Sequence, residues 1–389
     1  MEAYIVAGYR SAIGKAKRGG FKNYRSDDLA VDVIRHLASQ VPELDTTKVD
    51  DVIVGCANPE GEQGLQVARL ISARALGKEV PGVTINRYCA SGLEAISMAV
   101  SKVRAGFGHI FVAGGIESMS LIPMTGYKLA PSYKANLDNM NYHVGMGATA
   151  EAVAEKYNIS REASDQFSLE SHTKAANAID KGHFNDEIVP VTVEEVFVEN
   201  GKKVSKSHVV DTDEGVRRDT TLEALSKLRP AFKMGGIVTA GNSSQTSDGA
   251  AFVLVMSEEM VKQLGVKPIA RMVTCTSGGV DPLYMGIGPV EAIPKALDQA
   301  GLKLSDIEQT ELNEAFACQA LAVIQEAGLD PNTVNLNGGA IAIGHPLGCT
   351  GAKLTIQLLN EMKRRDQKYG MVTACVGGGQ GIAGIFERL

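Results

Sequence analysis

The sequence runs twice through the same alternation of apolar, β-rich segments and amphipathic helical segments. The first run consists of "AYIVAG", "DLAVDVIRHLASQ", "VDDVIVGCA", a helical pattern near 65–76, "GVTINR", a helical pattern near 91–105 and "HIFVAGG". The second consists of "KPIARMVTCTSG", "VEAIPKALDQAG", "IEQTELNEA", a helical pattern near 316–327, "NTVNLNGG", a helical pattern near 347–364 and "GMVTACVGGGQG". Such alternation is typical of a parallel sheet covered by helices. A period of more than about 100 residues is too long for a solenoid and indicates a duplicated α/β domain.

The segment between the two runs has a different character. It contains "MSLIPMTGYKLAPSYK", a helical pattern near 161–182 and the polar tract "VFVENGKKVSKSHVVDTDEG". We interpret it as a loop domain inserted over the first half, and such an excursion usually supplies a binding or lid element. "AAFVLVMSEE" at 250–259 is then the last strand of the first half. The predicted division is 1–117 with 249–265 for the N-terminal half, 118–248 for the insertion and 266–389 for the C-terminal half.

Composition excludes several classes of protein. The length of 389 residues suits two to three domains, and 44% hydrophobic with 22% charged residues allows a sizeable core. The net charge of −6 and pI near 5.7 argue against a nucleic-acid-binding protein. The N-terminus has no basic segment followed by an apolar one, no apolar run reaches the ~18 residues of a membrane span, and "FERL" is no peroxisomal address. Six cysteines without CxxC spacing predict free thiols and a cytoplasmic protein.

Four side chains with useful chemistry each follow a predicted strand. Cys89, in "NRYCASGLEAI", lies at a helix start, where the helix dipole and free N–H groups would stabilise a thiolate and lower its pKa. A buried, inert cysteine is the alternative. His345, in "NGGAIAIGHPLGCTGAK", lies among glycines that permit sharp bends and before a proline suited to a first helical turn. An ordinary glycine-rich turn with a solvated histidine is the alternative there.

Cys375 opens "CVGGGQG", whose glycines let backbone N–H groups converge on an anion or let a ligand approach closely. A phosphate loop would need a following Lys-Ser/Thr, which is not present. Asn313, in "LNEAFA", could be a site amide or a helix cap.

Ligands of doubly wound sheets bind beyond the carboxyl ends of the strands, so the duplication would bring these four residues together. Two thiols and an imidazole there suggest covalent thiol catalysis with a second acid/base group. A zinc site built from Cys89, His345 and Cys375 is the metal alternative. The ligands lack the usual paired spacing, so we predict no metal.

Five motifs carry a resemblance that covers the whole chain. "NRYCASGLEAI", "TAGNSSQTSDGAA", "NEAFA", "GGAIAIGHPLGCTGAK" and "CVGGGQG" resemble the thiolase family in the same order, and "GMGATAE" resembles the family's loop domain. The resemblance implies an α/β fold with two duplicated halves in a layered αβαβα arrangement and an inserted loop domain. Coenzyme A would be a co-substrate, with no tightly bound cofactor.

The resemblance also implies residue roles. Cys89 would carry the acyl group, His345 would activate it, and Cys375 would move the substrate α-proton. Asn313, through a water, and His345 would hold the thioester oxyanion, and the backbone N–H groups of Cys89 and Gly377 would form a second oxyanion hole. The coenzyme A contacts carried over by motif position are Arg217, Ser244, Ala240, Phe316 and Met146. Cys349 is expected to be structural.

The predicted function is thiolytic cleavage of 3-ketoacyl-CoA in fatty acid β-oxidation. "GMGATAE" lacks the histidine of some biosynthetic members, while "GHPLGCTGAK" and "GQGIAGIFERL" are more like degradative bacterial enzymes. The alternatives are a biosynthetic acetoacetyl-CoA thiolase, a ketoacyl synthase, which would favour a further histidine in place of Cys375, and a non-enzymatic acyl-CoA carrier. By resemblance we expect a homodimer or homotetramer, with a possible β-oxidation partner enzyme.

Overall fold

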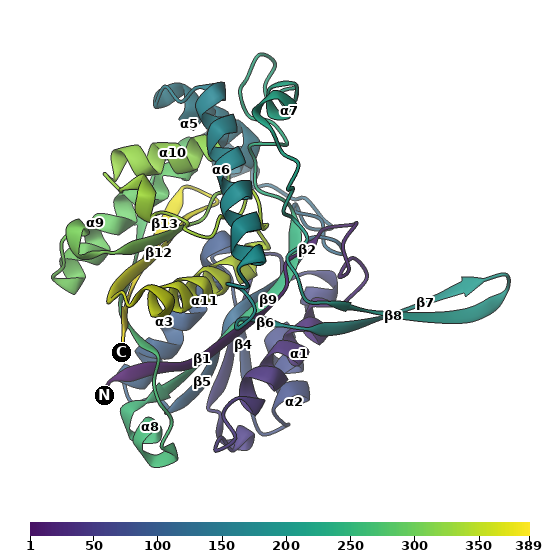
Figure 1. Cartoon of the computed structure of the whole chain (residues 1–389), viewed down its shortest axis with the longest axis vertical. Helices are drawn as coiled ribbons and strands as arrows, with labels where there is room; N and C mark the ends of the chain where they lie inside the picture. The colour runs from purple at the N-terminus through teal and green to yellow at the C-terminus, as the bar shows by residue number, and fades with distance from the viewer.

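The fold is built from two groups of strands that follow the same spatial order (Figure 1). The structure is a computed structural model that describes residues 1–389. The N-terminal group runs β4 (Gly82–Ile85), β3 (Asp51–Cys56), β5 (Ile110–Ser118), β9 (Ser247–Ser257) and β1 (Ala3–Ser11). The C-terminal group runs β11 (Gln309–Leu312), β12 (Tyr369–Val376), β13 (Gln380–Arg388) and β10 (Ala270–Gly279). The predicted duplication is therefore confirmed, and the groups meet where β1 pairs with β10.

The prediction of a parallel sheet is only partly correct. β3, β4 and β5 are parallel, as are β11 and β12, but β9 is antiparallel to both of its neighbours and β13 to both of its own. A tight turn explains the second case, because Gly378 (φ 82°) and Gly379 (φ 84°) reverse the chain directly from β12 into β13. Parallel neighbours need a long crossover, which this turn cannot provide. The strand β13 itself was not predicted.

Two central helices lie between the strand groups, and other helices cover the outer faces. α3 (Ser91–Arg104) and α11 (Leu347–Arg365) share one buried cluster with side chains from both groups. α1 (Ser26–Ser39) and α2 (Val67–Ala75) pack on the outside of the N-terminal group. α9 (Gly288–Ala300) and α10 (Ala317–Glu326) pack on the outside of the C-terminal group. This gives the predicted αβαβα layering.

The central helices cross closely near their N-termini. A Cβ on Gly92 would lie 2.7 Å from the backbone nitrogen of Ala352, and a Cβ on Gly351 would collide with the backbone of Leu93. Larger side chains would force the helices apart, since buried helices pack at native density. The residues that precede the two helices are therefore brought close together.

The segment between β5 and β9 spans both halves and does not lie only over the first. It contains α4 (Tyr133–Asp138), α5 (Met146–Lys156), α6 (Arg161–Asp180), β6 (Ile188–Val189), β7 (Val191–Glu199), β8 (Lys202–Val210) and α7 (Leu222–Ser226). α5 and α6 pack against α10 of the C-terminal half, whereas β6 pairs with β1 of the N-terminal half. The exact boundaries of the insertion stay a prediction.

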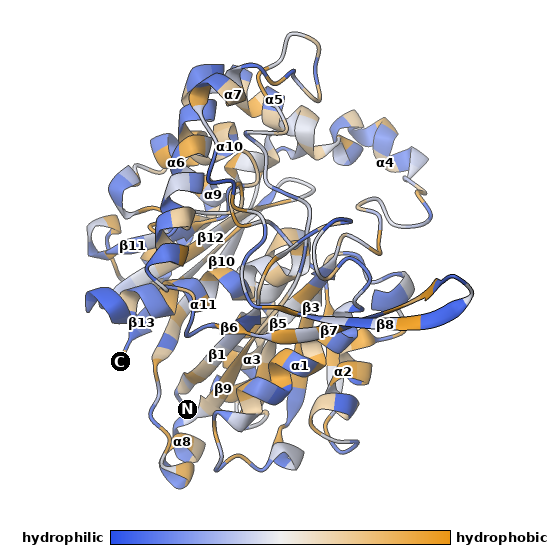
Figure 2. Cartoon of the chain, turned by 45° about the vertical axis from the view of Figure 1, so that its right-hand side comes forward, coloured by the Kyte–Doolittle hydropathy of each residue, from blue (hydrophilic) through white to orange (hydrophobic).

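The polar tract of the insertion folds into a long β-hairpin that projects from the body (Figures 1 and 2). Its turn is Asn200-Gly201, both with positive φ (52° and 74°), which is the favoured geometry for a two-residue hairpin loop. This hairpin was not predicted, although "NG" between alternating valines is its sequence signal.

The segment "NTVNLN" was predicted to be a strand, but it forms only an isolated bridge to the sheet. Only Val334 bridges to Thr310, and Asn335 then turns to a positive φ of 48°. The Asn335 side chain instead bonds the backbone N–H and C=O of Leu312, both at 2.8 Å. One amide side chain thus replaces a pair of ladder hydrogen bonds. No helix of the chain combines the length and apolar character required to cross a bilayer.

Candidate active site

Cys89 lies on a strained turn between β4 and α3. The preceding residue, Tyr88, has a φ of 45°, which is unusual for a bulky side chain. Three hydrogen bonds hold the turn: Tyr88 N donates to Asn86 Oδ1 (2.8 Å), Arg87 N donates to Ser91 Oγ (2.8 Å), and Ser91 Oγ donates to Tyr88 O (2.7 Å). Cys89 keeps part of its surface exposed. The strain therefore presents a reachable thiol at the start of α3.

The expectation of a lowered pKa for Cys89 is wrong for the free protein. Burial raises the pKa of the Cys89 thiol to about 12, and the negative charge of Glu117 adds to this effect. The N–H groups of Gly377 and of Cys89 itself act in the opposite direction but do not outweigh burial. The resting thiol is therefore neutral at pH 7, and its activation requires a base.

His345 is buried in an orientation that fixes which ring nitrogen carries the proton. Its Nδ1 lies 2.7 Å from Thr350 Oγ1, and the same hydroxyl donates to the carbonyl of Pro346 at 3.0 Å. Because the Thr350 proton is engaged there, its oxygen accepts from Nδ1–H, and Nε2 carries the lone pair. Asn313 Nδ2 lies 3.4 Å from this Nε2. Burial, and next the charge of Lys353, lower the pKa of His345 to about 3, so the ring is neutral at pH 7.

The glycine before His345 permits the bend that places the ring. Gly344 has a φ of 121°, and a Cβ there would collide with the Ser247 hydroxyl. The His345 N–H donates to the carbonyl of Gln245 at 3.0 Å, in a short parallel bridge to the "SSQTS" segment. The glycine thus serves close backbone approach rather than a solvated turn, which answers the alternative left open by the sequence.

Asn313 and Cys375 reach the site from neighbouring strands. The Asn313 N–H donates to the carbonyl of Thr373 at 2.9 Å, which ties the end of β11 to β12. The side-chain oxygen of Asn313 is buried and has no protein hydrogen-bond partner. Cys375 is fully buried, and burial, followed by the proximity of Cys89, raises the pKa of its thiol. The strand β12, which carries Cys375, also packs against the turn Tyr88–Ala90 that carries Cys89.

The predicted coenzyme A residues separate into two groups. Met146 and Phe316 pack in one cluster with Cys375, and a Cβ on Gly377 would lie 3.9 Å from Met146 Sδ. Ser244 is tied to the same region, because its N–H donates to the carbonyl of Ala315 at 2.9 Å. The other two residues, Ala240 and Arg217, are exposed. The backbone N–H of Arg217 donates to Nδ1 of His172 on α6, and not to Cys89, His345 or Cys375.

Similarity to known proteins extends over almost the whole chain. The description "Thiolase, N-terminal domain" matches residues 3–259, and "Thiolase, C-terminal domain" matches residues 266–388. The chain belongs to the thiolase family. This thiolase is 52% identical to the 3-ketoacyl-CoA thiolase of Bacillus subtilis (strain 168), over 99% of each chain. It is 43% identical to 3-ketoacyl-CoA thiolase 2, peroxisomal, of Arabidopsis thaliana, over 100% of this chain and 84% of that protein.

A solved structure agrees with the sequence relatives. The crystal structure of the Bacillus anthracis acetyl-CoA acetyltransferase has a TM-score of 0.89 and 40% identity, covering 100% of this chain and 99% of that one. The predicted thiolase fold and the acyltransferase class are therefore confirmed. The structure of this thiolase contains no cluster of three or more His, Cys, Asp or Glu side chains able to hold a metal ion.

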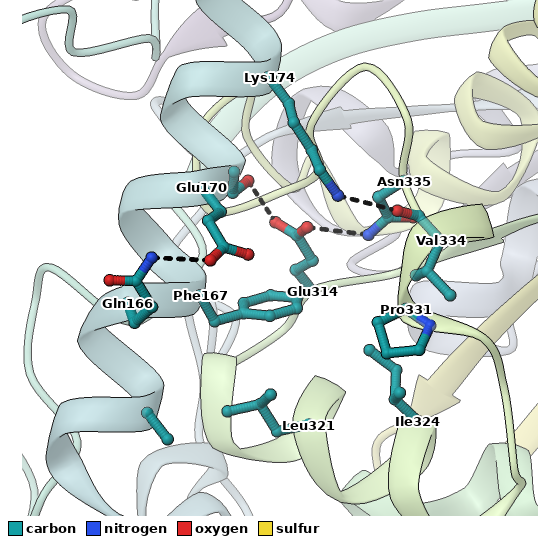
Figure 3. A pocket seen from close by; sticks show the side chains of 12 residues that line it. Gln166, Phe167, Glu170, Lys174, Glu314, Leu321, Ile324, Pro331, Val334 and Asn335 are labelled. Atoms are coloured by element: carbon teal, nitrogen blue, oxygen red, sulfur yellow. Dashed lines mark hydrogen bonds between the residues drawn. The ribbon is translucent and has the colours of Figure 1, made fainter.

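Two further residues of this thiolase help to build the site and were not predicted. Thr350 orients His345, as described above. Glu314 follows Asn313 and is buried, where it accepts from Ser171 Oγ (2.7 Å), Asn335 Nδ2 (2.8 Å) and Ile341 N (3.1 Å) (Figure 3). It therefore joins α6 to the loop that leads to His345. Both residues lie inside quoted motifs, but nothing in their spacing indicates these contacts.

A cavity of about 250 Å³ opens beside Glu314, between α6 and α10 (Figure 3). Its walls are largely apolar: Phe167, Leu321, Ile324, Pro331 and Val334. Lys174 lies at this cavity and donates to the carbonyl of Val334 at 3.2 Å. The cavity is separate from the constellation of thiols and imidazole, because Cys89, His345 and Cys375 do not line it.

Proposed function

We propose that this thiolase cleaves 3-ketoacyl-CoA with coenzyme A, giving acetyl-CoA and a shortened acyl-CoA, in the breakdown of fatty acids. One arrangement supports the proposal: the turn Tyr88–Ala90, which carries the reachable thiol Cys89, packs against α11, which begins next to His345, and against β12, which carries the buried thiol Cys375. The relatives named 3-ketoacyl-CoA thiolase support the same direction.

The first half-reaction forms the acyl-enzyme. His345 Nε2 accepts the Cys89 proton, and the thiolate attacks the C3 ketone of the substrate. The C2–C3 bond then breaks, its electron pair passes to the acetyl-CoA enolate, and Cys375 donates its proton to C2. Asn313, through a water, and protonated His345 would stabilise the enolate oxygen, and each such donor is typically worth about 3–4 kcal/mol.

The second half-reaction transfers the acyl group to coenzyme A. The Cys375 thiolate takes the proton of the incoming thiol, which attacks the thioester carbon of acyl-Cys89. The N–H groups of Cys89 and Gly377 would hold the tetrahedral oxyanion. Collapse releases the Cys89 sulfur, which recovers its proton from His345, so both cysteines return to their starting state.

These roles are tested by comparing acetylation of Cys89 by acetyl-CoA with the complete thiolysis reaction. Cys375→Ser should still acquire an acetyl group on Cys89 from acetyl-CoA, although more slowly, because in a single turnover the leaving coenzyme A thiolate can take its proton from solvent. It should lose thiolysis, because a hydroxyl is a far weaker acid than a thiol and cannot supply the proton to C2. Cys318→Ser is the matched control, since Cys318 is a buried thiol of the same apolar cluster on α10. Equal loss of labelling and turnover in Cys375→Ser would make Cys375 structural.

We also propose a preference for acyl chains longer than four carbons. In the stretch "SMSLIPMTGYKL", Met119 and Ile122 are buried, but Met124, Tyr127 and Leu129 leave 49%, 59% and 72% of their surface exposed. Apolar side chains of this kind could contact an acyl tail, and each buried methylene adds about 0.8 kcal/mol. A rise in kcat/KM from acetoacetyl-CoA to six- and eight-carbon substrates supports the proposal. A fall would favour biosynthetic acetoacetyl-CoA formation.

The remaining proposals concern context. Met146, Phe316 and Ser244 would contact coenzyme A beside the thiols, with Ala240 and Arg217 further along the bound molecule. We propose a cytoplasmic homodimer or homotetramer, which could also bind another β-oxidation enzyme. Light scattering coupled to gel filtration measures the assembly, and a monomer would contradict this proposal.

A further inference from the structure

The side chain of Gln245 bonds two segments that are distant from it in the sequence. Its amide nitrogen Nε2 donates to the carbonyls of Gly215 (2.9 Å), Ile341 (2.9 Å) and Ala342 (3.0 Å). A primary amide has two N–H groups, so at least one of them is shared between two carbonyls. The amide cannot be reversed, because its oxygen would then face three carbonyl oxygens. The orientation of this side chain is therefore fixed.

Two of the three carbonyls belong to the loop that leads to His345. Ile341 and Ala342 are buried, and Gln245 is the only protein group that donates to their carbonyls. The N–H of Ile341 is bonded separately, to Glu314 at 3.1 Å. A buried carbonyl without a donor costs free energy, so without this amide the loop would move to find other partners.

The backbone of Gln245 holds the same loop at its end. The carbonyl of Gln245 accepts from the His345 N–H at 3.0 Å and from the Ser247 hydroxyl at 2.9 Å. The contacts of Gln245 therefore lie on both sides of Gly344, whose φ of 121° bends the loop. Rotation about this glycine would carry the imidazole away from its place, and bonds on both sides of it oppose that rotation.

The third carbonyl connects the loop to the N-terminal half. A Cβ on Gly215 would lie 2.4 Å from the carbonyl oxygen of Ala342, so the two segments touch through their backbones. Two residues before Gly215, Asp213 accepts two hydrogen bonds from Arg10 of β1, at 2.8 and 3.0 Å. Gln245 thus fastens the loop to a segment that is anchored on the central sheet.

We propose that Gln245 is a positioning residue, whose amide holds the loop 341–345 so that the imidazole of His345 is placed to accept the Cys89 proton. Thr350 fixes the tautomer of the ring, whereas Gln245 fixes the backbone that carries it. The role of His345 as the base rests on the proposed function. The hold of Gln245 on the loop does not depend on that role.

The test compares three variants of the full-length protein. Gln245→Met keeps the length of the side chain but has no donor. Gln245→Glu keeps the shape, and its carboxyl donates only when it is protonated. Gln357→Met is the matched control, because the amide of Gln357 is also buried, on α11, but neither of its polar atoms has a protein partner.

Hydrogen–deuterium exchange measured by mass spectrometry reports on the loop directly. In Gln245→Met, peptides that cover residues 338–346 should exchange about tenfold faster than in the wild type, whereas peptides of α3 should not change. Gln357→Met should leave both regions at wild-type rates. Unchanged exchange of the loop in folded Gln245→Met, or an equal acceleration in Gln357→Met, would overturn the inference.

Activity gives a second readout, with a dependence on pH. Acetylation of Cys89 and thiolysis should both slow about 10- to 100-fold in Gln245→Met, because a displaced base no longer reaches its proton. The rate of Gln245→Glu relative to wild type should rise as the pH falls from about 8 to 6, because the protonated carboxyl donates to one of the carbonyls. The relative rate of Gln245→Met should stay constant over this range.

A relative rate of Gln245→Glu that does not change with pH would overturn the inference, even if Gln245→Met does not fold. If exchange of the loop becomes faster but neither reaction slows, Gln245 holds the loop as inferred and the proposed role of His345 as the base fails.

Discussion

The hydrogen bond between Thr350 and His345 offers a sharp test of how the site is organised. Thr350→Val replaces the hydroxyl by a methyl group of similar size. The imidazole Nδ1–H, now 2.7 Å from an acceptor, would then lie buried without one. The ring would lose the interaction that keeps its proton on Nδ1. The other tautomer, with the proton on Nε2, cannot accept a proton from Cys89.

The magnitude follows from the cost of an unsatisfied buried donor, about 1–3 kcal/mol. If the active tautomer is disfavoured by that amount, kcat/KM should fall about 5- to 150-fold. Thr350→Ser is the matched control, because it keeps the hydroxyl and its bond to the Pro346 carbonyl. Its activity should remain within about threefold of the wild type.

The assay is the initial rate of thiolysis of a 3-ketoacyl-CoA, alongside acetylation of Cys89 by acetyl-CoA. Both should slow together in Thr350→Val, since both need the base, and circular dichroism should confirm that the variant is folded. Wild-type rates in folded Thr350→Val would refute the tautomer argument. Equal losses in the serine and valine variants would show that packing of the threonine methyl, and not its hydroxyl, matters.

Two further predictions concern thiol reactivity and acid stability. Brief, limiting iodoacetamide should label Cys89 before Cys275, because we propose His345 as a base for Cys89 alone of these two thiols. Both are half-buried, and burial raises the pKa of each to about 12. Mass spectrometry showing Cys275 labelled first would contradict this. Burial, followed by the charge of Arg217, lowers the pKa of His172 to about 4. Between about pH 6.5 and 4 the unfolded chain therefore binds a proton at this residue that the folded chain does not, so the free energy of unfolding falls as the pH drops. The melting temperature of His172→Gln should therefore fall less than that of the wild type between pH 7 and 5. If the melting temperatures of both proteins change equally with pH, His172 is not a source of acid sensitivity.

Much of the architecture could be predicted from local patterns. Helix periodicity placed α3, α6, α10 and α11 within about two residues of their observed bounds, because an amphipathic helix repeats its apolar side every three to four residues. The repeated order of segments predicted the duplication, and five motifs indicated the family. The hairpin of β7 and β8 had a readable signal at Asn200-Gly201 that was not used.

The placement of the site residues depended on contacts that sequence patterns do not record. Ser171 and Glu314 bond across 143 positions of the chain, and the beginnings of α3 and α11 meet although they are more than 250 residues apart. Spacing within one motif carries no information about such distant partners. Strand direction was also decided this way, since the tight turn after β12 required β13 to return antiparallel.

The sequence by itself determined the helices, the duplicated order of strands and the identity of the reactive side chains, because these depend on residues close together in the chain. Only the tertiary structure decided their protonation. A helix start alone suggested an acidic Cys89, whereas burial makes it a neutral thiol, and burial with Lys353 makes His345 a neutral imidazole. Proton affinity depends on how completely distant elements remove a group from water, and that is a property of the packed fold.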